Sequence, residues 1–369
     1  MKPSPRIVRE LALEAGFDLV AIGPAAPGDG GGRFLSWVEA GRHGEMDWLA
    51  RNAERIASAG GFLTGARSAV TLGVDYGRPQ VALDGGGQVA RYAAGRDYHR
   101  ALGARLRRLK GALVQEGVEA GDLRYGVDAV PVLERALAAR AGLGFLAKTG
   151  GVIHPRRGPW LLLAEVLTRH DLEADPPSPG SCGTCRRCLE ACPTDAITAP
   201  FEVDARRCLS YTTIELRGPI PAALRAPQGD WVFGCDVCLE VCPYAKWGRG
   251  RPEDPDLALH PTVERYELVG LLELDEEAWQ RDFTGTAIRR ARREGLRRNA
   301  AIALGNLGRE DAVPALLRAV DDRDPGLVSA AAWALARLGR GREAIADALR
   351  RTDDEALRAD LEATLAGLG

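Results

Sequence analysis

Features of membrane, secreted and disulfide-built proteins are scarce in this chain. Its 369 residues include only eight cysteines, far too few for a disulfide scaffold. No run of about 18 apolar residues occurs, so we expect no membrane-spanning helix. The N-terminal stretch MKPSPRIVRELALEAGFD holds neither an apolar segment of signal-peptide length nor a twin-arginine pair. We therefore expect a cytoplasmic protein that makes no membrane contact and keeps its cysteines reduced.

A large excess of either charge is absent as well. Lys and Arg number 49 against 51 for Asp and Glu, which gives a formal net charge of −2. This balance excludes a generally basic nucleic-acid-binding protein but permits a local basic patch. A P-loop is also absent. The glycines of Gly142–Ala147 follow a helical pattern, which favours a helix end over a dinucleotide site.

The composition that is present supports a large core. Hydrophobic residues make up 46% and charged residues 27% of the chain, and its length predicts two or three domains. Residues 1–170 have the pattern of one mixed α/β domain. Pro131 suits the first turn of a helix and Gly142 the end of that helix. We expect strands near residues 17–22, 69–74, 123–127 and 160–166, and helices at 98–115 and 132–141.

Two breaker-rich stretches and an internal repeat organise the rest of the chain. Proline and polar residues predict linkers at Asp171–Ser181 and Gly248–Asp256. Further on, Asn299–Gly308 aligns with Ser329–Gly339 at an offset of 31, and a third copy ending at Gly369 follows at an offset of 30. Helix pairs of this period, with Ala and Leu on the packed faces, favour a HEAT-like α-solenoid over an ordinary Ala-rich bundle.

All eight cysteines lie between Cys182 and Cys242. The run C-G-T-C-R-R-C-L-E-A-C-P starts at Cys182 and has the spacing of bacterial ferredoxins, in which the fourth cysteine ligates the other cluster. The run C-D-V-C-L-E-V-C-P starts at Cys235, and Cys208 stands between the two runs. We therefore assign one 4Fe–4S cluster to Cys182, Cys185, Cys188 and Cys242, and a second to Cys192, Cys208, Cys235 and Cys238.

Other uses of these cysteines fit less well. Structural zinc prefers Cys or Cys/His pairs separated by a dozen or more residues, and this module contains no histidine. Disulfides do not suit the expected compartment. Two neighbouring clusters form a path for electrons, which indicates a redox role but no substrate. A non-catalytic electron-transfer or scaffold protein is therefore one alternative.

One segment departs from the neutral average. Between Arg281 and Ala300 there are seven arginines and two acidic residues, a local charge of +5. Such a patch is typical of a phosphate-binding surface, with a solvated helix face as the alternative. We expect nucleic-acid contacts over three helical turns at the start of the solenoid, from Arg289, Arg290, Arg292, Arg293, Arg297 and Arg298.

Several segments resemble, in order, the epoxyqueuosine reductase family. They are ARYAAGRDYH (Ala90–His99), GVDAVPVLERALAARAGLGFLAKTG (Gly126–Gly150), GPWLLLAEVL (Gly158–Leu167), CLSYTTIELRGPIP (Cys208–Pro221) and FGCDVCLEVCPYAKW (Phe233–Trp247). The resemblance implies an enzyme that reduces epoxyqueuosine to queuosine at the wobble position of tRNA, the last step of queuosine synthesis. It implies base-off cobalamin and two 4Fe–4S clusters as cofactors. The implied partners are a tRNA with a queuosine-type anticodon and a low-potential electron donor such as flavodoxin or ferredoxin.

The resemblance also implies site residues. Asp128 matches the family's general acid, for which we expect a pKa raised by a poorly solvated pocket. The alternative is that Asp128 only orders the turn before Pro131. Asp97-Tyr98-His99 resembles the Asp-x-His-x-x-Gly cobalt-ligating motif, but Gly103 comes one position late, so we expect no histidine ligand. Cobalamin contacts are implied at Arg91, Asp97, Asp128, Lys148, Val152, Ser210 and Asp236.

The expected fold class is mixed α+β, in four segments. These are an N-terminal α/β cobalamin-binding catalytic domain (1–170), a ferredoxin-like double-cluster module (171–248), a connecting helical segment with the basic patch (249–295) and HEAT-like repeats (296–369). We expect a monomer. The chief alternative function is a reductive dehalogenase that also pairs cobalamin with two clusters. Such an enzyme would normally carry a twin-arginine signal and no basic solenoid.

Overall fold

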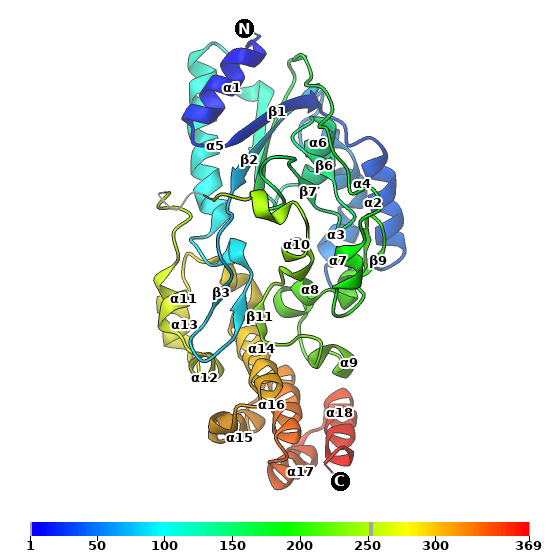
Figure 1. Ribbon diagram of the computed structural model, residues 1–369, viewed down its shortest axis with the longest axis vertical. Coiled ribbons are helices and arrows are strands. Elements are labelled where there is room, and N and C mark those ends of the chain that lie inside the picture. The colour runs from blue at the N-terminus through cyan, green and yellow to red at the C-terminus, as the bar shows by residue number, and fades with distance from the viewer. Residues whose placement is uncertain (1, 251–253, 369) are drawn as a thin grey trace. The chain divides into compact units, whose positions relative to one another are not determined.

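The computed structural model describes residues 2–250 and 254–368 and divides into two compact units (Figure 1). The first unit consists of Met1–Arg78, Arg96–Asp204 and Val237–Ala258, and the second of Pro79–Gly95, Ala205–Asp236 and Leu259–Gly369. Each unit therefore combines segments that are distant in the sequence, and the predicted four-segment division stays a prediction. Residues 251–253 of the second predicted linker, and Gly369 of the last predicted repeat, lie outside the described residues.

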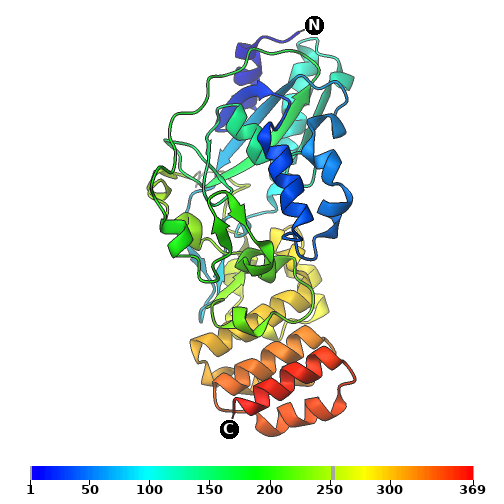
Figure 2. The same cartoon turned by 90° about the vertical axis from the view of Figure 1, so that its right-hand side faces the viewer.

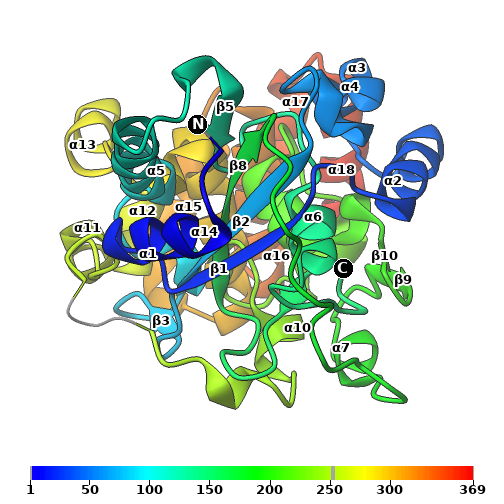
Figure 3. The same cartoon turned by 90° about the horizontal axis from the view of Figure 1, so that it is seen from above.

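The first unit is built on an antiparallel sheet in the strand order β1-β2-β8-β5. Its strands are β1 (Leu19–Pro24), β2 (Ser68–Asp75), β5 (Leu123–Gly126) and β8 (Leu161–Thr168). All residues of β2 are buried, which requires cover on both faces of the sheet. Helices α1 (Pro5–Glu14) and α5 (Tyr98–Gln115) lie on one side and α6 (Glu134–Arg140) on the other (Figure 3).

Local sequence signals explain the long helices of this unit. Ser4 caps α1 through a hydrogen bond from the Ile7 amide, and Pro5 occupies the first turn, where its missing N–H costs nothing. Asp97 caps α5 by accepting the amide of His99. The buried residues of α5 recur every three or four positions and face the sheet: Ala101, Leu102, Arg105, Leu106, Leu109 and Leu113. The predicted helix 98–115 and the four predicted strands are confirmed.

Shorter elements complete the first unit. They are α2 (Asp29–Glu39), α3 (Asp47–Arg51), α4 (Ala53–Ala57), β6 (Phe145–Leu146), β7 (Val152–Ile153), α7 (Arg187–Glu190), β9 (Ile197–Ala199), β10 (Glu202–Val203) and α10 (Val237–Glu240). Strands β6 and β7 form one hairpin, and β9 pairs with β10. No helix among the described residues is long and apolar enough to cross a bilayer.

Two local predictions for this unit need correction. Helix α6 begins at Glu134, so the prediction that Pro131 occupies its first turn is wrong. The segment before it is instead bent by short-range hydrogen bonds, from the Ala129 amide to the Val127 carbonyl and from the Val132 amide to the Val130 carbonyl. The predicted linker 171–181 is also less free than its composition suggests. Asp175 accepts the amide of Ile22 at 2.8 Å and pairs with Arg9, which fixes the segment against β1.

The second unit is mainly helical around a small sheet. Strand β11 (Trp231–Phe233) pairs in parallel with β4 (Gln88–Val89), and β4 pairs antiparallel with β3 (Val81–Ala82). The helices are α8 (Leu209–Ile214), α9 (Ala222–Arg225), α11 (Pro261–Arg265), α12 (Leu268–Leu272), α13 (Glu276–Asp282), α14 (Arg292–Leu307), α15 (Val313–Val320), α16 (Pro325–Arg337), α17 (Arg342–Arg351) and α18 (Glu355–Ala366).

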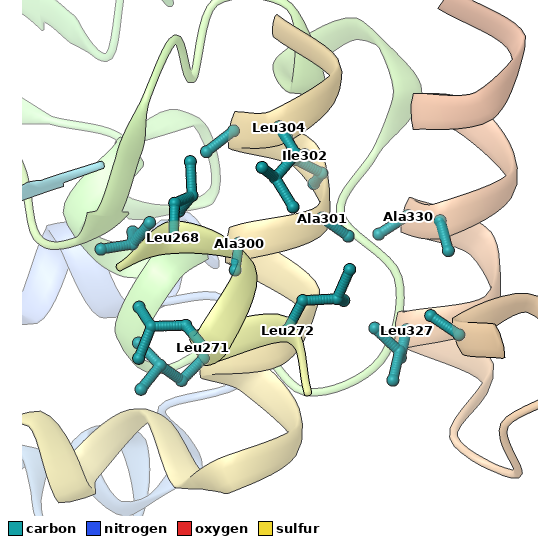
Figure 4. Close-up of a cluster of buried hydrophobic side chains, with 14 of the residues drawn as sticks. Leu268, Leu271, Leu272, Ala300, Ala301, Ile302, Leu304, Leu327 and Ala330 are labelled. Carbon is teal, nitrogen blue, oxygen red and sulfur yellow. The ribbon is translucent and has the colours of Figure 1, made fainter. Parts of the chain in front are cut away.

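Helices α14 to α18, orange to red in Figure 2, form the predicted repeats. The aligned glycines Gly308 and Gly339 both adopt left-handed φ angles, +68° and +66°, and end α14 and α16 in the same way. A Cβ on Gly305 would lie 2.8 Å from the Cα of Ala334, so the two helices approach as closely as their small residues allow. Leucines and alanines of α12, α14 and α16 fill the core between them (Figure 4).

Candidate active site

Asp128 lies in the loop between β5 and α6, two residues beyond the end of the strand. Its φ angle is +51°, a left-handed conformation that Asp tolerates better than most residues. Its backbone amide donates a hydrogen bond of 2.6 Å to Oε1 of Glu134. Its side chain is 61% exposed and accepts a hydrogen bond of 2.7 Å from the hydroxyl of Tyr98. A carboxylate is thus presented outward from a conformationally defined loop.

His99 joins this carboxylate to a second one. Its Nε2 atom lies 3.3 Å from Oδ2 of Asp128, and its Nδ1 atom lies 2.8 Å from Oδ1 of Asp97. Both side chains therefore face one imidazole, and Tyr98 stacks on the same ring with centroids 4.1 Å apart. Asp97 and Asp128, both predicted from the resemblance, are brought together in this way. Both ring nitrogens of His99 are therefore engaged by carboxylates.

The pKa shifts at this cluster place the proton on the histidine. Partial burial lowers the pKa of His99, but the hydrogen bonds to Asp128 and Asp97 outweigh it and raise the pKa to about 9. The hydrogen bond from His99 lowers the pKa of Asp128, and Tyr98 adds to this shift. At neutral pH the pair is therefore an imidazolium beside a carboxylate. The expectation that the pKa of Asp128 is raised is wrong in this structure, because two donors stabilise its charged form.

Two further carboxyl groups lie behind Asp128. Burial, reinforced by the charge of Asp128, raises the pKa of Glu134 to about 7. Glu165 in β8 is fully buried, and this burial holds the pKa of its carboxyl well above the usual range. Sequence reasoning assigned no role to Glu134, Glu165 or His99. A signal was present for Glu165, since a lone acid in the apolar run LLLAEVLT is rarely buried without a reason.

Four cysteine thiols come together in the first unit. Cys182 and Cys242 pack with Tyr244 against Phe145. Burial raises the pKa of Cys188 and of Cys242, and the thiols of Cys182 and Cys185 raise both further. Thiols close enough to oppose one another's ionisation are suited to a positively charged iron cluster, which relieves the repulsion. This is the set that the spacing predicts for cluster one.

Lys148, in the turn between β6 and β7, contacts the loop that begins at Cys182. Its backbone amide points at the sulfur of Cys182 at 3.5 Å, and its ammonium donates to the carbonyls of Gly183 and Cys185, each at 2.8 Å. Hydrogen bonds to cluster sulfurs are among the factors that set a cluster's potential. In this structure Lys148 therefore braces the ligand loop of cluster one, while its predicted contact with cobalamin stays a prediction.

The other four cysteines are divided between the units. Cys192 and Cys238 belong to the first unit and Cys208 and Cys235 to the second, so their assignment to cluster two also stays a prediction. All eight cysteines are free thiols, with no disulfide among them. In the described part of the chain, no group of three or more His, Cys, Asp or Glu is placed to hold a single metal ion. A four-iron cubane holds its thiolates further apart than one ion does.

Two predicted cobalamin contacts pair with each other inside the second unit. The backbone amide of Arg91 donates to Asp236 at 2.8 Å, and the guanidinium lies 3.4 Å from the same oxygen. Both side chains are nearly inaccessible, at 11% and 3% exposure, so their charges neutralise one another in the protein interior. Val152 is buried in the β6–β7 hairpin, and Ser210 is half-buried in α8.

The basic stretch differs from its prediction in two respects. Residues Ala287–Ala291 form a 3₁₀ turn, and α14 starts only at Arg292, whose φ is +61°, so the prediction of three continuous helical turns is wrong. Arg298 is 2% exposed and donates to the carbonyls of Thr212, Leu216 and Gly218 at 2.6–3.0 Å. The prediction that Arg298 contacts nucleic acid is wrong, because its guanidinium is consumed by buried carbonyls.

The other arginines of the stretch have partners of their own. Arg290 forms a two-pronged ion pair with Glu215, both contacts at 2.8 Å, and Arg289 lies over the ring of Trp279. Arg293 pairs with Glu276, and Arg297 with Asp322 at 2.8 Å. Of the six, Arg290 and Arg292 are the exposed residues. Much of the local positive charge is thus already balanced within the fold.

Thiol sets with ferredoxin spacing, a HEAT-like tail and a proton-holding cluster define an iron–sulfur oxidoreductase as the class of protein. Comparison with known families supports the cluster module and the repeats, and it adds a match over the catalytic unit. Residues 181–245 match a "4Fe-4S double cluster binding domain", residues 57–129 match "Epoxyqueuosine reductase QueG, DUF1730", and residues 283–366 match "HEAT repeats".

Individual relatives point to one family. The epoxyqueuosine reductase of Xanthomonas campestris pv. campestris is 38% identical over 340 residues, 90% of this chain and 95% of the relative. That of Escherichia coli strain K12 is 35% identical over 336 residues, 89% and 88% of the two chains. The chain belongs to the epoxyqueuosine reductase family. It is an oxidoreductase that reduces epoxyqueuosine in tRNA to queuosine, and the dehalogenase alternative is not favoured.

Solved structures agree with this membership. An epoxyqueuosine reductase with an epoxyqueuosine-modified tRNA-Tyr stem loop aligns with a TM-score of 0.86 at 27% identity, covering 98% of each chain. The Streptococcus thermophilus enzyme aligns with a TM-score of 0.83 at 30% identity, covering 97% of each chain. A Bacillus subtilis enzyme whose catalytic loop is swung out of its active site gives a TM-score of 0.86 at 26% identity, covering 99% of this chain and 98% of that one.

Proposed function

We propose that the cluster of Asp97, His99 and Asp128 delivers protons when the epoxide of epoxyqueuosine is reduced at the tRNA wobble position. Converting an epoxide to an alkene removes its oxygen as water and consumes two electrons and two protons. The observation that supports the proposal is an imidazole held between two carboxylates, one of them exposed. This arrangement keeps a proton at neutral pH within reach of an outside oxygen atom.

Each residue then has a distinct task. Asp97 fixes the orientation of the His99 ring through Nδ1, and its charge keeps the ring protonated. His99 stores the proton and passes it along its contact with Asp128. Asp128, presented outward by its loop, hands the proton to the oxygen as the C–O bond breaks, and the Tyr98 hydroxyl steadies the carboxylate in between. Asp128 is therefore the last group of a short relay.

Cobalamin, bound base-off, is the second cofactor that we propose. The family is cobalamin-dependent. When bound, a reduced corrinoid supplies a strongly nucleophilic, strongly reducing cobalt beside the substrate. The chain fits a cofactor without a histidine ligand, because both nitrogens of the one imidazole beside Asp128 are already engaged. The residues that we propose to hold it are Arg91, Asp97, Asp128, Lys148, Val152, Ser210 and Asp236.

Electrons have to enter through the clusters from an external carrier. We propose a low-potential protein donor such as flavodoxin or ferredoxin. Three exposed cations lie within a few residues of cluster-one ligands or of the turn packed beside them: Arg156, Arg187 and Lys246. Exposed cations beside the cluster favour fast, weak docking of an acidic carrier, which suits a donor that must deliver single electrons repeatedly.

The tRNA partner is supported by the stem loop bound to the solved relative. On this chain we propose that phosphates contact the exposed end of the basic stretch, at Arg292 and Arg290, with Arg289, Arg293 and Arg297 as secondary positions. We further propose that the protein is a cytoplasmic monomer. Within it, residues 1–170 would serve as the cobalamin-binding catalytic domain, 171–248 as the cluster module, 249–295 as the connecting segment and 296–369 as the repeats.

Anaerobic turnover tests the proposed chemistry. The reconstituted enzyme is given epoxyqueuosine-containing tRNA and a chemical reductant, with and without cobalamin, and the nucleosides are analysed by mass. We expect queuosine only with cobalamin present, and we expect Asp128→Asn to lower kcat by about 100-fold or more. Full turnover by Asp128→Asn would refute its proton-transfer role. Turnover that does not depend on cobalamin would refute the proposed cofactor.

A further inference from the structure

Three carboxyl groups form a row from the centre of the first unit's sheet to its catalytic loop. Glu165 lies in β8, opposite Gly126 of β5 and Thr71 of β2 in the register of the sheet. Glu134 is the first residue of α6, which packs against β8. Asp128 follows β5 and ends the row. Burial raises the pKa of both Glu134 and Glu165, and the charge of the next acid in the row raises each pKa further.

The contact between Glu134 and Asp128 runs through the backbone. Oε1 of Glu134 accepts the Asp128 amide at 2.6 Å, which is short for an N–H···O bond and typical of an ionised acceptor. The rest of this segment has short-range backbone hydrogen bonds at Ala129 and Val132, and Val130 and Val132 pack into a small hydrophobic cluster. A left-handed φ at a residue other than glycine persists only when its surroundings enforce it. The Glu134 carboxyl binds the backbone of Asp128, while Tyr98 and His99 bind its carboxylate.

Glu165 forms the inner end of the row. Oε2 of Glu165 lies 2.8 Å from the Thr71 hydroxyl, while its Oε1 atom is buried without a hydrogen-bond partner. Burial holds the pKa of this carboxyl well above its usual range, which favours its neutral form. A second negative charge behind Glu134 would repel it, so the neutral Glu165 leaves Glu134 as the single titrating acid next to the loop.

We propose that Glu134 is a positioning residue for the reaction: its carboxyl holds the backbone amide of Asp128, fixes the left-handed turn there, and so aims the Asp128 carboxylate at His99 and the substrate. This inference rests on the proposed role of Asp128. It assigns Glu134 no contact with the substrate, since the carboxyl acts through the Asp128 backbone.

The charges around Glu134 define a pH window for this function. Asp128 and Glu165 face it as acids, and Arg135 and His99 as cations. The pKa of Glu134 is about 7, so at higher pH its carboxyl is ionised and its hydrogen bond to the Asp128 amide is strongest. The pKa of His99 is about 9, so at lower pH its ring still carries the proton. The loop is therefore fixed and the proton is available together between about pH 7 and pH 9.

Two substitutions of Glu134 distinguish a positioning role in catalysis from a purely structural role. Glu134→Ala removes the acceptor, and Glu134→Gln keeps a carbonyl acceptor in the same place without the charge. Glu355→Ala is the matched control, because Glu355 is also the first residue of a helix but is exposed. Each variant of the full-length holoenzyme is measured for kcat and KM with the modified stem loop, for the pH profile of kcat, and for hydrogen exchange of the peptide spanning 126–134.

We expect Glu134→Ala to lower kcat by about 10- to 100-fold, with KM for the stem loop within about twofold, and to speed exchange of the loop. Glu134→Gln should restore slow exchange and most of kcat, while the acid limb near pH 7 disappears from the profile. The proposal is overturned if Glu134→Ala matches Glu355→Ala in kcat and in loop exchange. It is equally overturned if Glu134→Gln keeps the wild-type acid limb.

The proposed proton-transfer role of Asp128 can fail independently of the role of Glu134, and the two failures give different results. If Asp128→Asn keeps full turnover, Asp128 is not the proton-transferring group, whatever Glu134 does. Loop exchange in Glu134→Ala still reports on the bond to the Asp128 amide in that case, because exchange does not depend on catalysis. Unchanged exchange then refutes the positioning role separately.

Discussion

Replacing Arg298 by Ala should destabilise the second unit strongly, and it should do so without a specific effect on tRNA. The guanidinium is buried and satisfies three backbone carbonyls and the side chain of Asn299. Removing it leaves those carbonyls without donors in the interior and opens a cavity. Unsatisfied buried groups cost about 1–3 kcal/mol each, with partial relaxation, so we expect a loss of about 3–5 kcal/mol.

A thermal melt of the holoprotein, followed by circular dichroism, measures this loss. For a unit of this size each kcal/mol lowers Tm by about 2–4 °C, so Arg298→Ala should melt roughly 6–20 °C below wild type. Arg292→Ala is the control, since Arg292 is exposed and its removal should stay within about 0.5 kcal/mol. If Arg298→Ala instead melts with wild type and weakens tRNA binding about tenfold, Arg298 contacts the nucleic acid and the buried hydrogen-bond network is refuted.

Three further substitutions test other parts of the structure. Arg292→Glu should weaken tRNA binding, measured by fluorescence anisotropy, and should make the slope of log K against log salt concentration shallower by about one. An unchanged slope would place the phosphates elsewhere. Cys242→Ser should lower the iron content of the purified enzyme to about half, because cluster one loses a ligand, and a full complement of iron would contradict the assignment. His99→Gln should move the alkaline limb of kcat to lower pH. The pKa of His99 is raised to about 9, so wild-type activity falls only as pH rises through that value, and a variant with the same limb would show that another group titrates there.

The sequence predicted most of the architecture because the signals that determine it are local. Apolar periodicity located α5 from Tyr98 to Gln115, and the repeat offset located the equivalent glycines at the ends of α14 and α16. Cysteine spacing predicted a thiol set whose four members do interact in the first unit. Periodicity and ligand spacing are properties of neighbouring residues, which is why they can be read without a structure.

The site was predicted less completely because its chemistry depends on distant contacts. The pKa of Asp128 is lowered and not raised, since His99 and Tyr98 approach it from a helix that begins some thirty residues earlier in the chain. Arg298 belongs to the same basic run as the exposed Arg290 and Arg292, yet its burial makes it a structural residue. Charge counted along a sequence does not reveal which arginines already have partners. Those partners depend on how the helices pack.

The position of α14 has a consequence for how chains of this kind can change in length. This helix opens the repeats and also packs against β11, α8 and α12, so it belongs to the repeat array and to the core of its unit at once. Later helices are also tied to the body of the unit: α16 packs on α14, and Asp360 of α18 pairs at 2.9 Å with the buried guanidinium of Arg225 in α9. Loss of α14 would therefore remove the helix against which β11 packs, and loss of α18 would leave the buried Arg225 guanidinium without its carboxylate partner. Shortening the repeats therefore disturbs groups in the core of the unit as well as the repeats themselves.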